Sequence, residues 1–156
     1  MVGGGKDREE MREILFKAKK LNGSEWVIGS YVHTFNEDKK CPVVGVMTEN
    51  HWIVEINGNM ILIDKETICQ YTGLTDKNGN KIWENDIIAT DCGNVRVIYS
   101  AEPSPFENSF YVGFEVLFSN ITDNENYRHD LGYWSVMRGF EVIGNTFDNA
   151  DLLKGE

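Results

Sequence analysis

Short runs of β-branched and aromatic residues, separated by turn-forming residues, constrain this chain more than any other feature of its sequence. In the first half of the chain these runs lie at 26–32, 43–47, 51–56 and 60–63. Asn57-Gly58 separates the last two, and both residues tolerate the positive φ of a type I′ turn, so the pair predicts a tight hairpin. Many short strands at close spacing are typical of a small barrel or of two small sheets.

The second half of the chain continues this pattern. The stretch at 76–80 (DKNGN) predicts another turn, after which Ile82 and Trp83 resume a strand. Further strands are expected at 87–89, 95–99, 110–118 and 139–145, with a tight turn at 91–94 and polar loops at 102–109 and 120–126. The segment at 148–154 predicts a short capped helical turn, because an acidic residue opens it and Lys154 closes it.

The start of the chain gives two different signals. Residues 1–10 are Gly-rich and then charged, which predicts a flexible tail or extension. The apolar residues at 11–21 fit one face of a helix, but Ile14, Phe16 and Ala18 also fit the alternation of a strand. Periodicity alone favours a helix here.

The net charge restricts the partners that this chain can have. Its 156 residues include 25 acidic and 15 basic side chains, which gives a formal net charge of −10. Between residues 101 and 156, ten acidic side chains stand against three basic ones, so this part of the chain repels a nucleic-acid backbone. The charge excess favours solubility. A face that imitates nucleic acid or docks on a basic partner is the second interpretation.

The sequence offers no segment suited to a membrane. No run approaches the roughly 20 apolar residues of a transmembrane helix. The Gly-rich and charged start does not resemble a secretory signal. We therefore expect a cytoplasmic protein with no membrane partner.

The residue types that usually bind metals are scattered along the sequence. No cysteine or histidine has another cysteine or histidine within four positions. Disulfide frameworks and zinc sites usually need closer spacing, so we expect reduced, structural cysteines, no cofactor and no metal site. The residues concerned are Cys41, Cys69, Cys92, His33, His51 and His129.

Acidic residues supply the other candidate chemistry. The DKNGN turn alternates carboxylate and amide oxygens, but Lys81 and Ile87 stand where a calcium loop needs Gly and Glu, which excludes that kind of site. Glu84, Asp86 and Asp91 are the residue types of a magnesium-dependent nuclease, although a chain so rich in acids also places such groups in solvated turns. The sequence contains neither a serine or cysteine nucleophile motif nor a phosphate-binding loop.

Three segments, in this order, resemble one known family. Residues 11–18 (MREILFKA) are similar to its opening strand, 67–88 (TICQYTGLTDKNGNKIWENDII) to its central signature and 139–153 (GFEVIGNTFDNADLL) to its closing segment. This is the YopX family of phage and prophage proteins. Asn85 stands where the family usually has Gly, and Asn is the best substitute if the site needs a left-handed backbone. Ala150 replaces the usual Pro, which removes a fixed φ but is compatible with a helix.

The resemblance implies an α+β fold that is mostly β. Short antiparallel strands would form a small Src-homology-3-like barrel, beside a second small β-rich part and a short C-terminal helix. Residues 11–156 would form one YopX-like domain after the 1–10 tail, with a candidate subdivision near 64–80, where turn residues interrupt the strands. The resemblance also makes 12–18 a strand, which overrides the helical periodicity.

The resemblance carries over no catalytic residue, so we expect a non-enzymatic protein-interaction module. Its partners would be itself, as a homo-oligomer, and a host or phage protein, because aromatic residues are plentiful and small sheets leave exposed edges. The candidate contact or signature residues are Tyr71, Asp76, Trp83, Glu84, Asp86 and Tyr133. One alternative is a metal-dependent nucleic-acid-processing enzyme that uses Asp86 with Glu84 or Asp91. Another is an acidic decoy that mimics DNA for a host DNA-binding protein.

Overall fold

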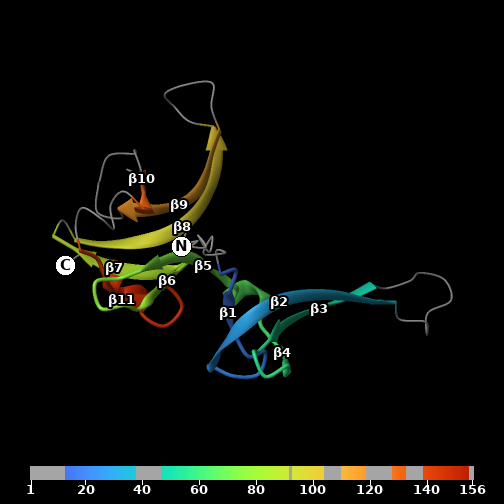
Figure 1. Ribbon diagram of the computed structural model, residues 1–156. Coiled ribbons are helices and arrows are strands. Elements are labelled where there is room, and N and C mark those ends of the chain that lie inside the picture. Colours follow the sequence, from blue (N-terminus) through green and yellow to red (C-terminus); the bar gives the residue numbers. More distant parts are fainter. Residues whose placement is uncertain are drawn as a thin grey trace, which may run out of the picture.

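The structure, a computed structural model of the chain, describes residues 13–37, 47–91, 93–103, 110–118, 128–132 and 139–154. These residues form two antiparallel sheets and two short 3₁₀ helices (Figure 1). Within the described ranges, no helix has the length and the apolar character needed to cross a membrane.

The first sheet has six strands in the order β4-β3-β2-β1-β5-β6. Its strands are β1 (Phe16–Lys19), β2 (Trp26–Glu37), β3 (Met47–Val54), β4 (Met60–Leu62), β5 (Cys69–Thr75) and β6 (Lys81–Trp83). The short strand β1 lies in the middle, because it pairs with β2 on one side and with β5 on the other. The 3₁₀ helix η1 (Lys65–Thr67) leads from β4 to β5.

The second sheet has five strands in the order β10-β9-β8-β7-β11. Its strands are β7 (Asp86–Thr90), β8 (Gly93–Pro103), β9 (Phe110–Phe118), β10 (Arg128–Asp130) and β11 (Glu141–Asn145), and the 3₁₀ helix η2 (Ala150–Leu153) follows β11. In Figure 1 the curved β8–β9 hairpin lies at one end of the molecule and the β2–β3 hairpin extends from the other. The chain passes from the first sheet to the second at 84–85, between β6 and β7.

The fold class is confirmed as mostly β with antiparallel strands, but the expected small closed barrel is wrong. The strand–turn–strand unit that suggested a barrel does form, as the β7–β8 hairpin. Its sheet ends in β10 on one side and in β11 on the other, and among the described strands these two do not pair. A barrel closes only when its edge strands join, so the chain folds into open sheets.

Two loops share the sequence Asn-Gly-Asn and the same pattern of hydrogen bonds. Between β3 and β4, the Gly58 N–H donates to the Glu55 carbonyl (2.8 Å) and the Glu55 N–H donates to the Asn59 carbonyl (2.9 Å). The corresponding bonds close the loop at 76–80, at 3.0 and 2.8 Å. Gly58 has a φ of 87°, whereas Asn57 is not among the residues with positive φ. The predicted hairpin is therefore confirmed, but its type I′ turn is wrong, since that turn needs positive φ at both central residues.

Most of the predicted strands are confirmed. β9 has the predicted bounds, the strand predicted at 12–18 forms as β1, and β2, β3, β4, β7, β8 and β11 overlap their predicted segments. Strands β5 and β10 were not predicted, and β8 continues through Pro103 into the expected loop. Of the segment predicted at 43–47 only Met47 is described, and the expected tail at 1–10 and loop at 120–126 lie outside the described residues.

The buried apolar residues form three clusters. The largest cluster lies at the second sheet and consists of Ile82, Ile88, Val95, Val97, Val116, Leu131 and Phe140. A second cluster, in the first sheet, consists of Ala18, Val27, Ile53 and Ile63. A third cluster consists of Cys69, Tyr71 and Trp83, with Leu15 and Trp26 packed against it. Residues of β5 and β6 therefore build the part of the core next to the point where the chain changes sheets.

Candidate functional site

A buried ion pair joins the two sheets. Lys17 on β1 lies with its Nζ 3.0 Å from Oδ1 of Asp86, the first residue of β7, and only 13% and 3% of the two side chains are exposed. The other carboxylate oxygen of Asp86 accepts the backbone N–H of Trp83 at 2.8 Å. Burial raises the pKa of Asp86, while Lys17 and the Trp83 N–H act against this shift. Both oxygens of this carboxylate therefore have partners within the chain.

Two tryptophans surround the Lys17 ammonium group. Its Nζ lies 5.0 Å from the ring centroid of Trp26 and 5.4 Å from that of Trp83, within the range of cation–π attraction. Trp83 in turn packs against Tyr71 across the β5–β6 pair, with 5.4 Å between the ring centroids. Tyr71 and Trp83 are both buried. These two candidate contact residues thus pack in the core of the chain.

A second polar connection joins the first sheet to the C-terminal segment. Asp148, in the turn after β11, accepts hydrogen bonds from Lys19 Nζ and from Trp26 Nε1, the latter at 2.8 Å. These bonds lower the pKa of Asp148 to about 2. Helix η2 forms beyond it as expected, but Asn149 at the N-cap position makes no side-chain capping bond. The predicted acidic cap is therefore wrong, because Lys19 and Trp26 bind Asp148 instead.

The predicted turn at Asp76 is confirmed in detail. Its Oδ1 accepts the backbone N–H groups of Asn78 and Asn80, each at 2.9 Å, and its Oδ2 accepts the side-chain amide of Asn80 at 3.2 Å. Oδ2 also accepts the N–H of Val142 on β11 at 3.1 Å. Burial alone would raise the pKa of Asp76, but these hydrogen bonds, led by that from Val142, hold it below its ordinary value. Asp76 thus fixes the loop and attaches it to the second sheet.

Glu84 and Asn85 make the connection between the sheets. Asn85 has a φ of 66° and is the one non-glycine residue with positive φ among those described, which confirms the left-handed backbone expected there. Its Oδ1 accepts two hydrogen bonds from the Arg96 guanidinium, at 3.1 and 2.5 Å. Burial raises the pKa of Glu84, while the N–H of Gln70, 3.4 Å from its Oε2, and the charge of Arg96 oppose the shift.

The candidate residues from the sequence do not converge on one metal-binding group. Asp86 lies at the junction of the sheets, Asp76 holds a loop and Asp91 is exposed after β7. Tyr133 lies outside the described residues. Among the His, Cys, Asp and Glu side chains that the structure describes, the group whose ligand atoms come close enough to hold one ion does not include Glu84, Asp86 or Asp91.

That group consists of His33, Glu49 and His51, with one ligand atom of each within 4.8 Å of the others. The β2–β3 register places His33 directly opposite His51, and Glu49 lies two residues before His51, on the same face of the strand. The two imidazole rings are stacked, with 4.4 Å between their centroids and 10° between their planes. In each ring Nε2 lies 3.8 Å from Oε2 of Glu49.

Tyr31 contacts His51 from the other side. Its hydroxyl oxygen lies 2.6 Å from Nδ1 of His51. Nε2 of His51, in contrast, is buried and has no hydrogen-bond partner. Burial and the charge of Glu49 raise the pKa of Tyr31. One nitrogen of His51 is therefore oriented by a hydroxyl group, while the other faces the Glu49 carboxylate.

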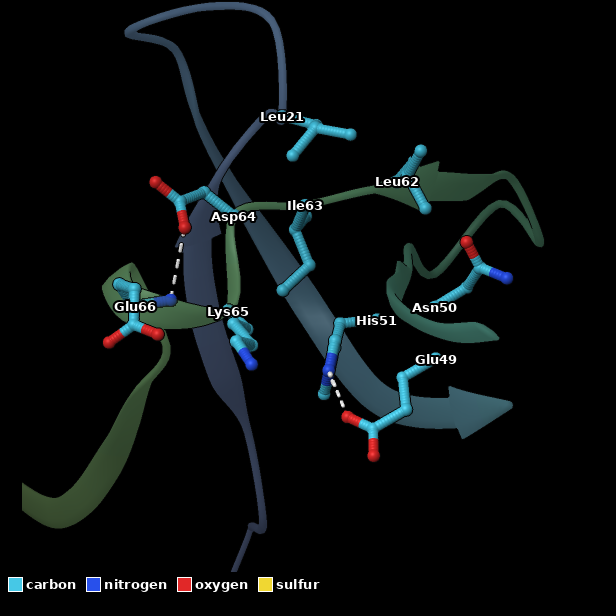
Figure 2. Close-up of a pocket in the computed structure, with 9 residues that line it drawn as sticks. All are labelled: Leu21, Glu49, Asn50, His51, Leu62, Ile63, Asp64, Lys65 and Glu66. Carbon is cyan, nitrogen blue, oxygen red and sulfur yellow. Dashed lines mark hydrogen bonds and ion pairs between the residues drawn. The ribbon is translucent and has the colours of Figure 1, made fainter. Parts of the chain in front are cut away.

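A hollow of about 300 Å³ lies beside His51. It is lined by Leu21, Glu49, Asn50, His51, Leu62, Ile63, Asp64, Lys65 and Glu66. Figure 2 shows Glu49 and His51 on one side of it, and Asp64, Lys65 and Glu66, from the start of η1, on the other. Asp64 caps η1 by accepting the N–H of Glu66 at 3.0 Å. His51 and Glu49 therefore stand next to a space that water or a small polar group can enter.

His33, Glu49 and His51 were not predicted as a group, because His33 lies far from the other two along the chain. Glu49 and His51 have the spacing that puts two side chains on one face of a strand. His33 joins them only through the register of the hairpin, which pairs residues that are far apart in the sequence. The Glu-x-His spacing was the available signal, but Glu49 falls between the predicted strands at 43–47 and 51–56, whereas the observed β3 runs through both residues.

Strands β2 and β3 extend beyond the rest of the first sheet as a two-stranded arm, which we define as residues 33–37 and 47–51. β1 pairs with β2 only as far as Gly29, and β4 pairs with β3 from Val54 to Trp52. At the inner end of the arm the His51 carbonyl accepts the N–H of Ile63, just after β4, at 3.0 Å. Beyond that point no third strand among those described pairs with the arm, and Figure 1 shows it projecting from the molecule. Two strands alone are marginally stable in water, and their free edges present unpaired backbone groups.

Apolar side chains are exposed on the arm and also in the body of the first sheet. Phe35 on the arm is 55% exposed. In the body of the sheet, where β1 pairs with β2, Ile28 is half exposed and Ile56 fully exposed. A hollow of about 490 Å³ lies there, lined by Glu13, Leu15, Ile28, Gly29, Ser30, Val54, Glu55, Ile56 and Asn57. Exposed apolar surface of the kind that Ile28 and Ile56 form around this hollow is typical of protein–protein contact sites.

Comparison with known proteins identifies the family. The chain matches the family model described as YopX protein over residues 7–154, which covers nearly all of its length. No curated protein matches it. The matched range includes all three segments that carried the resemblance, at 11–18, 67–88 and 139–153. The chain therefore belongs to the YopX protein family.

Proposed function

We propose that this chain is a phage- or prophage-encoded, non-enzymatic protein-interaction module. Its first partner is a second copy of itself, in the cytoplasm of the host bacterium, and the assembled form binds a host or phage protein. The observation that carries this proposal is the arm, whose two strands leave the sheet without a third strand beside them among the described residues.

The edges of the arm favour self-association. Along each edge, alternate backbone N–H and C=O groups point away from the partner strand, so a further strand can add main-chain hydrogen bonds. Phe35, 55% exposed on the arm, supplies apolar area to be covered in the same contact. A two-fold contact between two arms uses the same surface twice and therefore needs no second kind of partner.

The signature carboxylates support a structural role rather than a catalytic one. Asp86 is bound by Lys17 and by the Trp83 N–H, so metal binding there would first have to break a buried ion pair. Asp76 uses both of its oxygens to hold its loop. These contacts of Asp86 and Asp76 connect the first sheet, which carries the arm, to the second sheet.

Sedimentation velocity of the full chain at micromolar concentration, with EDTA present, tests the proposal. We expect an oligomer for the wild-type chain and a monomer for Phe35→Lys, because an ammonium group on the arm opposes burial of its surface. Val112→Lys is the matched control, since Val112 on β9 is 58% exposed against 55% for Phe35, and it is expected to stay oligomeric.

Two outcomes contradict this proposal. A wild-type chain that sediments as a monomer, or a Phe35→Lys variant that associates like the wild type, removes the arm as a contact surface. Cleavage of DNA with Mg²⁺ or Mn²⁺ present, lost in Asp86→Asn while the fold is kept, would replace the proposal with the enzymatic alternative.

A further inference from the structure

The strongest unassigned chemistry in the described residues is the imidazole pair on the arm. We propose that His33, Glu49 and His51 bind a divalent transition-metal ion of the zinc class. Two ligands come from β3 and one from β2, so the bound ion links the two strands of the arm.

The distances suit a single ion. Zinc bonds to imidazole nitrogen and carboxylate oxygen are 2.0–2.2 Å long, so two ligands of a tetrahedral ion lie about 3.4 Å apart. Nε2 of His33 and Nε2 of His51 each lie 3.8 Å from Oε2 of Glu49. The two imidazole planes are only 10° apart, so the His33 ring must tilt for both Nε2 lone pairs to point at one ion. The His33 and Glu49 side chains, 31% and 50% exposed, have the freedom to make this adjustment and to close the difference in distance. The backbone register already holds the three side chains on one face.

His51 shows the arrangement expected of a metal ligand. A ligating histidine usually donates its second ring N–H to an oxygen, which fixes the tautomer and the ring orientation. The Tyr31 hydroxyl oxygen, 2.6 Å from Nδ1 of His51, is such an acceptor. With the proton on Nδ1, the lone pair of His51 lies on Nε2, which is buried and lacks a hydrogen-bond partner. A metal ion gives this nitrogen the partner that the protein does not supply.

The donor set selects the class of ion. Two imidazoles and one carboxylate suit zinc and its neighbours, whereas Mg²⁺ and Ca²⁺ prefer sites made of oxygen ligands. Three protein ligands leave a fourth position of a tetrahedral ion open. The hollow of about 300 Å³ beside His51 can supply a water molecule to that position. Asp64, Lys65 and Glu66 line its far side (Figure 2) and do not belong to the group whose ligand atoms come close enough to hold the ion.

Calorimetric titration of the EDTA-treated, full-length chain with Zn²⁺ tests the proposal. We expect one high-affinity ion per chain and no comparable binding of Mg²⁺. His33→Ala and Glu49→Gln should each lower the Zn²⁺ affinity at least about tenfold. Glu66→Gln is the matched control, because Glu66 lines the same hollow but does not belong to the proposed ligand set, and it should bind like the wild type.

Tyr31→Phe tests whether the Tyr31 hydroxyl orients His51 for metal binding, without disturbing the fold. It keeps the ring that packs 5.6 Å from Phe16 and removes only the hydroxyl group, so the fold should persist while Zn²⁺ affinity falls about 10–100-fold. Circular dichroism of each variant checks the fold. Co²⁺ in place of Zn²⁺ should give the visible bands of a tetrahedral nitrogen–oxygen site, without a thiolate charge-transfer band.

Three results would overturn the proposal. The first is absence of Zn²⁺ binding by the folded wild-type chain. The second is binding that is unchanged in both His33→Ala and Glu49→Gln. The third is a thiolate band that disappears in Cys41→Ser, which would assign the ion to a cysteine site instead. Because self-association is measured in EDTA, its failure and the failure of the metal site are independent results.

Discussion

Lys17 and Asp86 are 69 residues apart in the sequence, and their 3.0 Å ion pair bridges the two sheets. Lys17→Met should lower the free energy of unfolding by about 3 kcal/mol, because it leaves a buried carboxylate without its counter-ion. Urea unfolding of the variant measures the loss. Lys20→Met is the control: the Lys20–Glu25 pair is exposed, so its loss should cost less than about 1 kcal/mol. Equal stability of Lys17→Met and the wild type would contradict this role of the pair.

Asp148 should give the chain a pH-dependent stability on the acid side. Its pKa in the folded chain, about 2, lies below the ordinary value of 3.8, so the ionised form stabilises the native state. This contribution is complete above the ordinary value and is lost as the pH falls through about 2. The side chain is 38% exposed, and solvent screening limits the effect to less than about 1 kcal/mol.

The measurement compares Asp148→Asn with the wild type by urea unfolding at a series of pH values. We expect a difference in unfolding free energy at neutral pH that shrinks as the pH falls from the ordinary value through about 2. Asp151→Asn is the control, because the Asp151 side chain is 90% exposed and should show no such difference. A pH-independent difference would mean that the Asp148 charge is not the cause.

Two substitutions of Asn85 should distinguish the energetic cost of its left-handed backbone from the loss of its side-chain hydrogen bonds. Both Asn85→Gly and Asn85→Ala remove the hydrogen bonds from Arg96, but only glycine adopts a φ of 66° without strain. The alanine variant should therefore be less stable than the glycine variant by about 1 kcal/mol. Thermal unfolding of the two variants measures this difference. Equal melting temperatures would show that the left-handed conformation carries no penalty here.

Cys69 should be unreactive while the chain is folded. It is a free thiol, 1% exposed, and burial raises its pKa to about 11 despite a hydrogen bond from Asn85, so little thiolate forms. In the double variant Cys41→Ser/Cys92→Ser, a chromogenic disulfide reagent should leave the native chain unlabelled and label it fully in urea. Rapid labelling of the native double variant would contradict the burial. The expected reduced, structural cysteine is confirmed at Cys69, whereas Cys41 and Cys92 lie outside the described residues.

Features encoded by adjacent residues were predictable from the sequence. The loops at 55–59 and 76–80 carry glycine where the backbone needs positive φ, and Asn85 is the substitute expected where glycine is missing. Most strands followed from runs of β-branched and aromatic residues. The short-range preferences of these residues agree with the final fold, so no distant contact had to be known.

Features that depend on distant contacts were not predictable in this way. The Asp148 side chain suits a helix cap, but Lys19 and Trp26 compete for it from more than 120 residues away. His33 meets His51 only after the hairpin has set its register. The closure of a barrel depends on whether edge strands meet, and alternation along one strand does not carry that information.

The central position of β1 means that the two halves of the first sheet are joined through this one strand. This four-residue strand is the one that the strand order places between the β4-β3-β2 half and the β5-β6 half. Its Ala18 is fully buried in the core of the first half, and its Lys17 binds the second sheet. Cleavage of the backbone between β1 and β2 would therefore leave two fragments that hold each other by strand insertion. A synthetic peptide with the sequence of β1 would insert between β2 and β5 of a chain that lacks this strand and would restore the first sheet, as in fragment complementation.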